Sequence, residues 1–157
     1  MLTIELIREL FDYDPETGMI TRKVSYGRAN AGQQFITACN ISVLGRPIRP
    51  GRLAWALHNG DWPPEDMFVD HINGIKADNR IANLRLATPT QNQYNKAGTG
   101  TYAKGVTWRN RKDKPWQAKI RVDGVRIHLG SFVTQDEAAE AYREACIRYH
   151  GEFANVE

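Results

Sequence analysis

Asp70 and His71 stand side by side near the middle of the chain, directly after the short apolar run Met67-Phe68-Val69. A histidine has a reference pKa of about 6.5 and can accept a proton near neutral pH. An aspartate supplies a hard carboxylate oxygen of the kind that Mg²⁺ and Mn²⁺ prefer. Hydrolysis of a phosphodiester requires a base to activate water and a cation to stabilise charge on the phosphate and the leaving oxygen. The pair has residue types suited to that reaction, whereas an isolated Asp-His pair is usually an ordinary surface feature.

Asparagines follow this pair at Asn73, Asn79 and Asn83, and another stands at Asn92. An asparagine-rich loop is usually turn chemistry, so we expect a structural role for Asn79 and Asn83. We expect Asp78 and Asn79 to tie the loop to backbone groups. Asn92 differs because it falls on a predicted helix, where its amide oxygen could be a second, neutral ligand of a cation. Water and substrate phosphate would complete the metal shell.

Local patterns predict the elements that must position these residues. Residues 67–69 have the pattern of an apolar strand, 73–79 that of a polar loop and 84–87 that of an alternating strand. A helix is predicted to start at Thr88-Pro89, because proline is tolerated in the first helical turn. The predicted order is therefore strand, loop, strand, helix.

The string from Val69 to Arg85, with Asn92 downstream, closely resembles the HNH nuclease family, and especially its phage and intron-encoded branch. The resemblance covers about residues 52 to 96. It implies a motif of two strands and one helix around one divalent metal, Mg²⁺ or Mn²⁺.

By this resemblance, His71 is the general base, and Asn83 braces the loop that orients it. Asp70 and Asn92 are the metal ligands. The family name implies a final histidine at the position of Asn92, but the branch that this chain resembles often carries asparagine there. With one charged ligand in the set, the affinity for metal should be weak. The implied contacts to DNA phosphate from this region are Arg80 and Arg85.

Residues 104–157 show the clearest alternation of apolar and polar side chains, which predicts a sheet with one buried and one wet face. Asp123-Gly124 predicts a hairpin between the last two strands. Thr134 and Glu137 form a capping box that opens an alanine-rich helix. The alternation predicts that Trp108, Trp116, Ile120, Ile127 and Leu129 belong to the core. It predicts that the wet face carries Thr107, Arg109, Gln117, Lys119, Arg121, Arg126 and His128.

The charge distribution favours a nucleic-acid reader in this region. From Lys104 to Gly130, eight basic residues stand against two acidic ones, whereas from Thr134 to His150 four acidic residues stand against two basic ones. A basic sheet backed by an acidic helix is expected of such a reader, although a solvated surface could carry the same charges.

Four segments of this region are similar to the plant ethylene-response-factor (APETALA-type) DNA-binding domain: Gly105–Arg109, Trp116–Arg121, Arg126–Phe132 and Glu137–Tyr142. The resemblance covers about residues 101 to 156 and implies that the exposed face of the sheet lies in the major groove of double-stranded DNA. The seven wet-face residues and Lys104 are then the expected DNA contacts. His128 stands where family members often carry an aromatic residue, so the preferred DNA sequence does not carry over.

The 157 residues thus predict an α+β protein. An N-terminal strand and helix scaffold (1–60), with strands near 19–24 and 41–44 and a helix at 52–58, precedes the ββα-metal motif (62–96). Together they form a nuclease domain, 1–96. A linker at 97–103 leads to a DNA-binding domain, 104–157, in which a three-stranded antiparallel sheet packs on one helix.

Several function classes are disfavoured. Cys39 and Cys146 lack the paired spacing of a zinc cage, and Cys146 falls on the apolar stripe of the predicted C-terminal helix as a buried thiol. No apolar stretch is long enough to span a bilayer, and the N-terminus has no signal pattern. We expect a cytoplasmic protein with no membrane partner; the sequence does not give the oligomeric state, and a monomer is favoured. His58 and His150 are expected to be structural or to face DNA.

These features predict a metal-dependent DNA endonuclease of the phage or mobile-element homing type. Two alternatives stay open: a DNA-binding regulator whose HNH block is inactive, and an RNA-directed nuclease. The set Asp70, His71 and Asn92 argues against the first, and the likeness of the sheet to readers of duplex DNA argues against the second.

Overall fold

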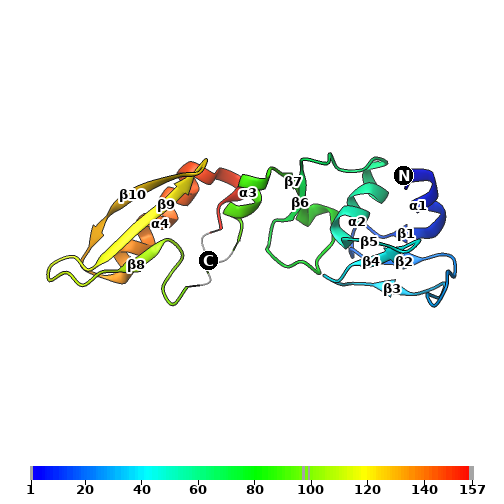
Figure 1. Ribbon diagram of the computed structural model, residues 1–157, viewed down its shortest axis with the longest axis horizontal. Coiled ribbons are helices and arrows are strands. Elements are labelled where there is room, and N and C mark those ends of the chain that lie inside the picture. Colours follow the sequence, from blue (N-terminus) through cyan, green and yellow to red (C-terminus); the bar gives the residue numbers. More distant parts are fainter. Residues whose placement is uncertain (1, 97, 99, 156–157) are drawn as a thin grey trace. The chain divides into compact units, whose positions relative to one another are not determined.

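The computed structural model describes residues 2–96, 98 and 100–155. The chain forms two compact units, Met1–Thr88 and Pro89–Glu157, and each is described by itself (Figure 1). Both combine helices with antiparallel strands, so the predicted α+β class is confirmed. In the described part of the chain, no helix is long and apolar enough to cross a membrane.

The first unit begins with helix α1, Ile4–Leu10, whose N-terminus is capped by the Thr3 hydroxyl accepting from the Leu6 amide. Strands β1 (Phe11–Tyr13), β2 (Ile20–Arg22) and β3 (Gln34–Phe35) form one antiparallel sheet. Strands β4 (Ile41–Val43) and β5 (Arg46–Ile48) form a hairpin. Helix α2, Pro50–Asn59, starts with its proline at the first position and ends at Gly60 in the left-handed conformation. The large, fully buried side chains of this scaffold's core include Ile7, Phe11, Ile20, Ile41, Val43 and Leu53.

The predicted strand, loop and strand of the central motif are present. Strands β6 (Phe68–His71) and β7 (Leu84–Ala87) pair antiparallel, and the register places Asp70 opposite Arg85 and His71 opposite Leu84. A short 3₁₀ turn, η1 (Ile81–Asn83), leads from the loop into β7. Leu84 belongs to the same buried core as the scaffold, so the motif and the scaffold fold as one body.

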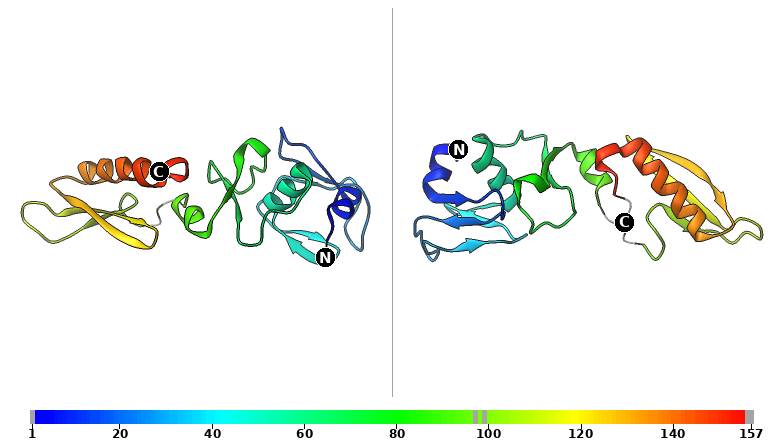
Figure 2. Two further views of the ribbon diagram at one scale, coloured as in Figure 1. Left: turned by 90° about the horizontal axis from the view of Figure 1, so that it is seen from above. Right: turned by 180° about the vertical axis from the view of Figure 1, so that it is seen from behind.

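The second unit holds α3 (Pro89–Tyr94), β8 (Val106–Trp108), β9 (Trp116–Val122), β10 (Val125–Phe132), α4 (Gln135–His150) and η2 (Gly151–Phe153). The strands form an antiparallel sheet in the order β10-β9-β8, and α4 covers one of its faces (Figure 2). Thr134 and Glu137 make both bonds of the predicted capping box. The buried thiol predicted for Cys146 is also found, beside Ile120 and Tyr142.

The sheet departs from strict alternation at several positions. Trp108, expected in the core, is 47% exposed, so that prediction is wrong; it is the last residue of an edge strand and has a neighbouring strand on one side only. Gln117, expected on the wet face, is only 9% exposed because it lies on the central strand between its register partners Thr107 and Ser131. The pairing of β9 with β10 also shifts between His128 and Gly130.

Helix α3 is anchored to the rest of the second unit. None of its six residues is buried, and so short a helix is not stable alone. The ring of Tyr94 stacks on His150 with centroids 3.7 Å apart, and its hydroxyl accepts from the Asp123 amide at 2.9 Å. Lys104 Nζ donates to the Tyr94 carbonyl at 2.7 Å. The sequence predicted that this helix ends the nuclease domain, whereas it packs with the C-terminal sheet and helix. Residues 97 and 99 of the predicted linker lie outside the described residues.

Candidate active site

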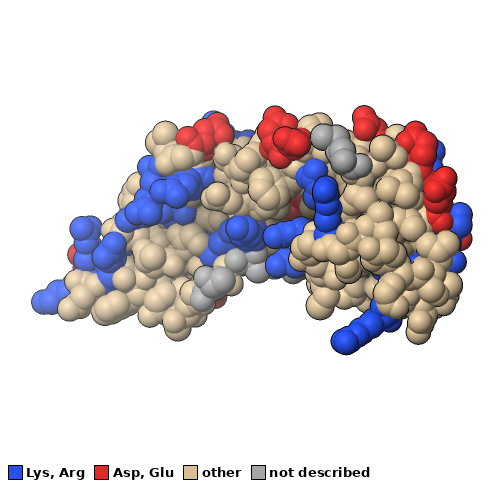
Figure 3. Space-filling view, turned by 45° about the vertical axis from the view of Figure 1, so that its right-hand side comes forward, with Lys and Arg blue, Asp and Glu red and all other residues tan. Residues whose placement is uncertain are grey.

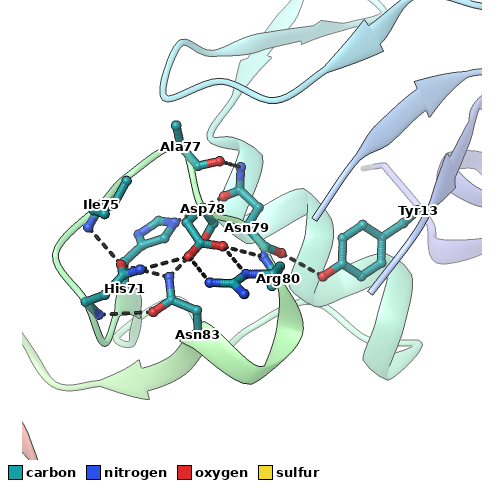
Figure 4. A network of polar contacts seen from close by, with 9 residues as sticks. Tyr13, His71, Ile75, Ala77, Asp78, Asn79, Arg80 and Asn83 are labelled. Atoms are coloured by element: carbon teal, nitrogen blue, oxygen red, sulfur yellow. Dashed lines mark hydrogen bonds and ion pairs between the residues drawn. The ribbon is translucent and has the colours of Figure 1, made fainter. Parts of the chain in front are cut away.

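His71 ends strand β6, and its ring contacts the side chain of Asn79. The distance between His71 Nε2 and Asn79 Oδ1 is 3.1 Å (Figure 4). Asn79 is completely buried, and its Nδ2 donates to the carbonyls of Thr37 and Ala77, each at 3.3 Å. Asn79 therefore ties the loop to backbone groups, as predicted, and also contacts the expected general base.

Asp70 precedes His71 on the same strand, and its buried carboxylate is paired with Arg85. Arg85 Nε donates a hydrogen bond to Asp70 Oδ2 at 3.0 Å, and Arg85 Nη2 lies 2.9 Å from the same oxygen. The pair joins register partners on β6 and β7, and both side chains are nearly buried. Arg85, predicted to contact DNA phosphate, thus contacts the expected metal ligand. A carboxylate compensated in this way binds a cation less strongly than an unpaired one.

Asn83 holds the two ends of the loop together. Its Oδ1 accepts from the Asn73 amide at 3.0 Å, and its Nδ2 donates to Asn73 Oδ1 at 3.0 Å and to the Asp78 carbonyl at 2.8 Å. Asn73 Oδ1 also accepts from the Ile75 amide at 2.9 Å, which closes a turn inside the loop (Figure 4). Hydrogen bonds of this kind can brace the loop. The catalytic role of Asn83 stays a prediction.

Arg80 and Asp78 form a two-pronged ion pair in the same loop. Arg80 Nε and Nη2 donate to the two carboxylate oxygens at 2.8 and 2.6 Å. The bonds from Arg80 are the largest cause that lowers the pKa of the Asp78 carboxyl below its usual range. The Arg80 side chain is 54% exposed, so phosphate contact by its outer edge stays a prediction.

The scaffold reaches the loop through Tyr13, a residue that the sequence did not indicate. Its hydroxyl donates to the Asn79 carbonyl at 2.7 Å. Burial, and then the negative charges of Asp14 and Asp78, raise the pKa of Tyr13 to about 12, so the phenol stays protonated at neutral pH. No local pattern could have revealed this contact, because the two residues are 66 positions apart.

The expected metal ligands lie in different units: Asp70 on β6 in the first and Asn92 on α3 in the second. Their joint coordination of a metal stays a prediction from the motif. Within the described residues, no group of three or more His, Cys, Asp or Glu side chains is placed to hold a metal ion. The chemistry of the expected set, one carboxylate and one amide oxygen, fits a hard divalent cation that keeps most of its shell as water and phosphate.

The wet face of the second unit gathers basic side chains (Figure 3). Arg121 pairs in register with Arg126, and Lys119 pairs with His128, so these side chains share one face of the sheet. Arg109, Arg121, Arg126 and His128 are exposed, and Lys119 is half-buried. Lys104 differs from them because its ammonium donates to the carbonyls of Tyr94 and Lys96 and burial lowers its pKa. That arrangement favours a role for Lys104 in holding α3 over the predicted DNA contact.

Comparison with known proteins agrees with both parts of this description. A family model described as HNH endonuclease matches residues 51–94. The chain is 37% identical over 91 residues to an uncharacterised HNH endonuclease of Acanthamoeba polyphaga mimivirus, which covers 58% of this chain and 47% of that protein. It is 30% identical over 104 residues to Protein 3.8 of Escherichia phage T7, covering 64% of this chain and 83% of that protein.

The C-terminal region is similar to plant transcription factors. An AP2-like ethylene-responsive transcription factor of Oryza sativa subsp. japonica is 50% identical over 50 residues, which are 31% of this chain and 8% of that protein. No solved structure matches the chain. The chain spans about half the length of the mimivirus relative. It belongs to the HNH endonuclease family, and its nuclease motif is joined to an AP2-like C-terminal region.

Proposed function

We propose that this protein is a metal-dependent DNA endonuclease in which the β6–β7 motif cleaves the strand and the C-terminal sheet binds double-stranded DNA. The observation that carries the proposal is His71, held against the buried Asn79 at 3.1 Å within the segment that matches HNH endonucleases. A base held in one orientation is what activation of a water molecule requires.

In this proposal, His71 removes a proton from the water that attacks the phosphorus. Asp70 and Asn92 would hold a divalent cation, and the oxygen character of these ligands favours Mg²⁺ or Mn²⁺. When bound, the cation supplies positive charge for the phosphate and the leaving oxygen. Asn83 keeps the loop between β6 and β7 closed, and in this way braces the loop that orients His71.

The C-terminal sheet binds DNA through its basic face. Arginines on such a face can pair with guanine, while lysine and threonine more often hold phosphate. The face proposed here comprises Thr107, Arg109, Gln117, Lys119, Arg121, Arg126 and His128, of which the almost buried Gln117 has the smallest accessible surface for a base. Arg80 and Arg85 are the proposed phosphate contacts of the nuclease motif. The viral relatives favour a role in a phage or mobile element, where a homing-type cut would serve the element.

A second candidate is a DNA-binding regulator with an inactive nuclease motif. The observation that favours it is the Asp70–Arg85 pair, because a guanidinium already compensates the carboxylate that a cation would use.

Cleavage of a supercoiled plasmid, with Mg²⁺, with Mn²⁺ and with EDTA, distinguishes these functions. The nuclease proposal expects nicked or linear product with metal only, and a loss of about 10²–10⁴-fold in rate for His71→Ala. The variant should keep its DNA affinity in a gel-shift assay. Wild-type protein that binds the plasmid but never cuts it under these conditions would establish the regulator instead.

A further inference from the structure

The buried amide of Asn79 has a fixed orientation, and this orientation determines which nitrogen of His71 carries a hydrogen. The Nδ2 end faces the carbonyl oxygens of Thr37 and Ala77, which can only accept hydrogen bonds. The opposite orientation would direct Oδ1 against both of these oxygens. Oδ1 therefore faces His71 and must accept, so the hydrogen of the neutral ring lies on Nε2 and its basic lone pair lies on Nδ1.

The surroundings prevent Asn79 from leaving this position. The side chain is completely buried, and its backbone carbonyl accepts from Tyr13 Oη at 2.7 Å. Gly18 lies so close to the backbone of Asn79 and Arg80 that an added Cβ would stand 2.5 Å from the Arg80 nitrogen. A buried amide with this many partners loses all of their hydrogen bonds if it turns away, which is costly.

The first turn of helix α2 lies beside the His71 ring, next to its contact with Asn79. A Cβ added to Gly51 would stand 3.2 Å from His71 Cε1 and 3.6 Å from Asn79 Oδ1. The first turn of α2 therefore lies directly against the bond between ring and amide, with little room for a side chain. The helix therefore leaves the ring little room to move on the side of its Cε1 atom.

We infer that Asn79 is a positioning residue of the nuclease: its side-chain oxygen holds the hydrogen of His71 on Nε2 and thereby presents Nδ1 as the base, with Gly51 limiting the tilt of the ring. The inference rests on the proposed role of His71. It gives Asn79 a role distinct from that of Asn83, which acts on the loop.

Two readouts test it in the full-length protein. In ¹⁵N-histidine NMR, at a pH where the ring is neutral, the wild-type His71 signals should show hydrogen on Nε2, and His71→Ala identifies those signals by their loss. Asn79→Leu, similar in size but without an acceptor, should show a mixture of both tautomers. It should lower kcat for plasmid cleavage by about tenfold or more, with KM for DNA within about twofold of wild type. Asn79→Asp keeps an acceptor and should recover part of the kcat that Asn79→Leu loses.

Gly51→Ala is the second variant, and it leaves the hydrogen-bonding groups of Asn79 unchanged. It should keep the wild-type tautomer and still lower kcat by a few fold, because the new methyl group displaces the ring. Hydrogen on Nδ1 in the wild-type protein overturns the inference, as does wild-type kcat in a folded Asn79→Leu protein. If Asn79→Leu fails to fold, two other results decide. Hydrogen on Nδ1 in the wild-type protein, or an unchanged kcat in Gly51→Ala, overturns the inference. The NMR readout needs no cleavage, so it is independent of the proposed function. If the wild-type ring carries its hydrogen on Nε2 but His71→Ala still cleaves DNA, only the proposed role of His71 as the base is refuted.

Discussion

Replacement of Arg85 by methionine should make the stability of the first unit depend on divalent metal. The variant keeps most of the aliphatic volume but removes a charge-assisted hydrogen bond, at 3.0 Å, and an ion-pair contact, at 2.9 Å, both to Asp70 Oδ2. The side chains are 13% and 8% exposed, so solvent screens the pair little. Loss of one partner from a pair of this kind lowers the free energy of unfolding by roughly 3 kcal/mol.

A cation bound at Asp70 would replace the lost guanidinium charge. Ligand present at 100 times its Kd stabilises the folded state by about 2.7 kcal/mol, so saturating Mg²⁺ should restore most of the loss. In the wild-type protein, where Arg85 already compensates the carboxylate, the stabilisation by Mg²⁺ should be smaller. The measurement is urea unfolding with Mg²⁺ or EDTA, with the amide NMR signals of residues 2–88 reporting on the first unit.

Two control variants make the result specific to Asp70. The double variant Arg85→Met with Asp70→Asn should show no gain from Mg²⁺, since the carboxylate is absent. Arg80→Met removes the partner of another carboxylate, Asp78, and its stability should respond to Mg²⁺ no more than that of the wild type. Equal stabilisation of Arg85→Met and of the double variant by Mg²⁺ would show that Asp70 is not the metal ligand, and the reasoning would be refuted.

Three further predictions concern the second unit. Tyr94→Phe should lower the free energy of unfolding of the fragment 89–157 by about 1 kcal/mol, as expected for hydroxyl bonds to Asp123; the same stability as wild type in urea unfolding would contradict the anchoring of α3. Burial lowers the pKa of His150, so the unfolded state binds more protons than the folded state, and the free energy of unfolding of this fragment should fall as the pH drops below about 6.5. His150→Gln should flatten that pH dependence. An unchanged pH profile in this variant would show that His150 is not its cause. Lys119→Ala should weaken binding to all DNA sequences and reduce the salt slope by roughly one, whereas Arg121→Ala should cost about 1–3 kcal/mol at one base position. Neither should change the single-turnover cleavage rate at saturating enzyme, and a loss in Arg121→Ala as large as that in His71→Ala would mean that this face takes part in the chemistry.

Local patterns in the sequence predicted the elements whose signals are contained in a few neighbouring residues. Strands β6 and β7, the hairpin at Asp123-Gly124 and the capping box of α4 all have such signals. Strands β1 and β3 were not predicted, because they have only three and two residues and are stabilised by pairing with β2. Alternation correctly assigned most side chains to a face, but it does not give depth. Gln117 on the central strand is almost buried, and Trp108 at the end of an edge strand is exposed.

The candidate site was predictable only as far as its motif. Asp70, His71 and Asn83 follow from spacing and resemblance, whereas the ring contact from Asn79 depends on where the chain folds back in space. The partners Tyr13, Thr37 and Gly51 lie far upstream, with no local feature to mark them. The Asp70–Arg85 pair follows from strand register, which the sequence alone did not specify.

The bond between Tyr13 and the Asn79 carbonyl has a consequence for engineering. The segment that matches HNH endonucleases starts at residue 51, yet the loop behind His71 is closed by a phenol on β1 and by the carbonyl of Thr37. A cassette cut at residue 51 and grafted onto another protein would lack both groups, and its His71 would lose the rigid backing of Asn79. A transplantable form of this motif must therefore include β1 and the segment that carries Thr37, so the smallest exchangeable piece is larger than its recognisable motif.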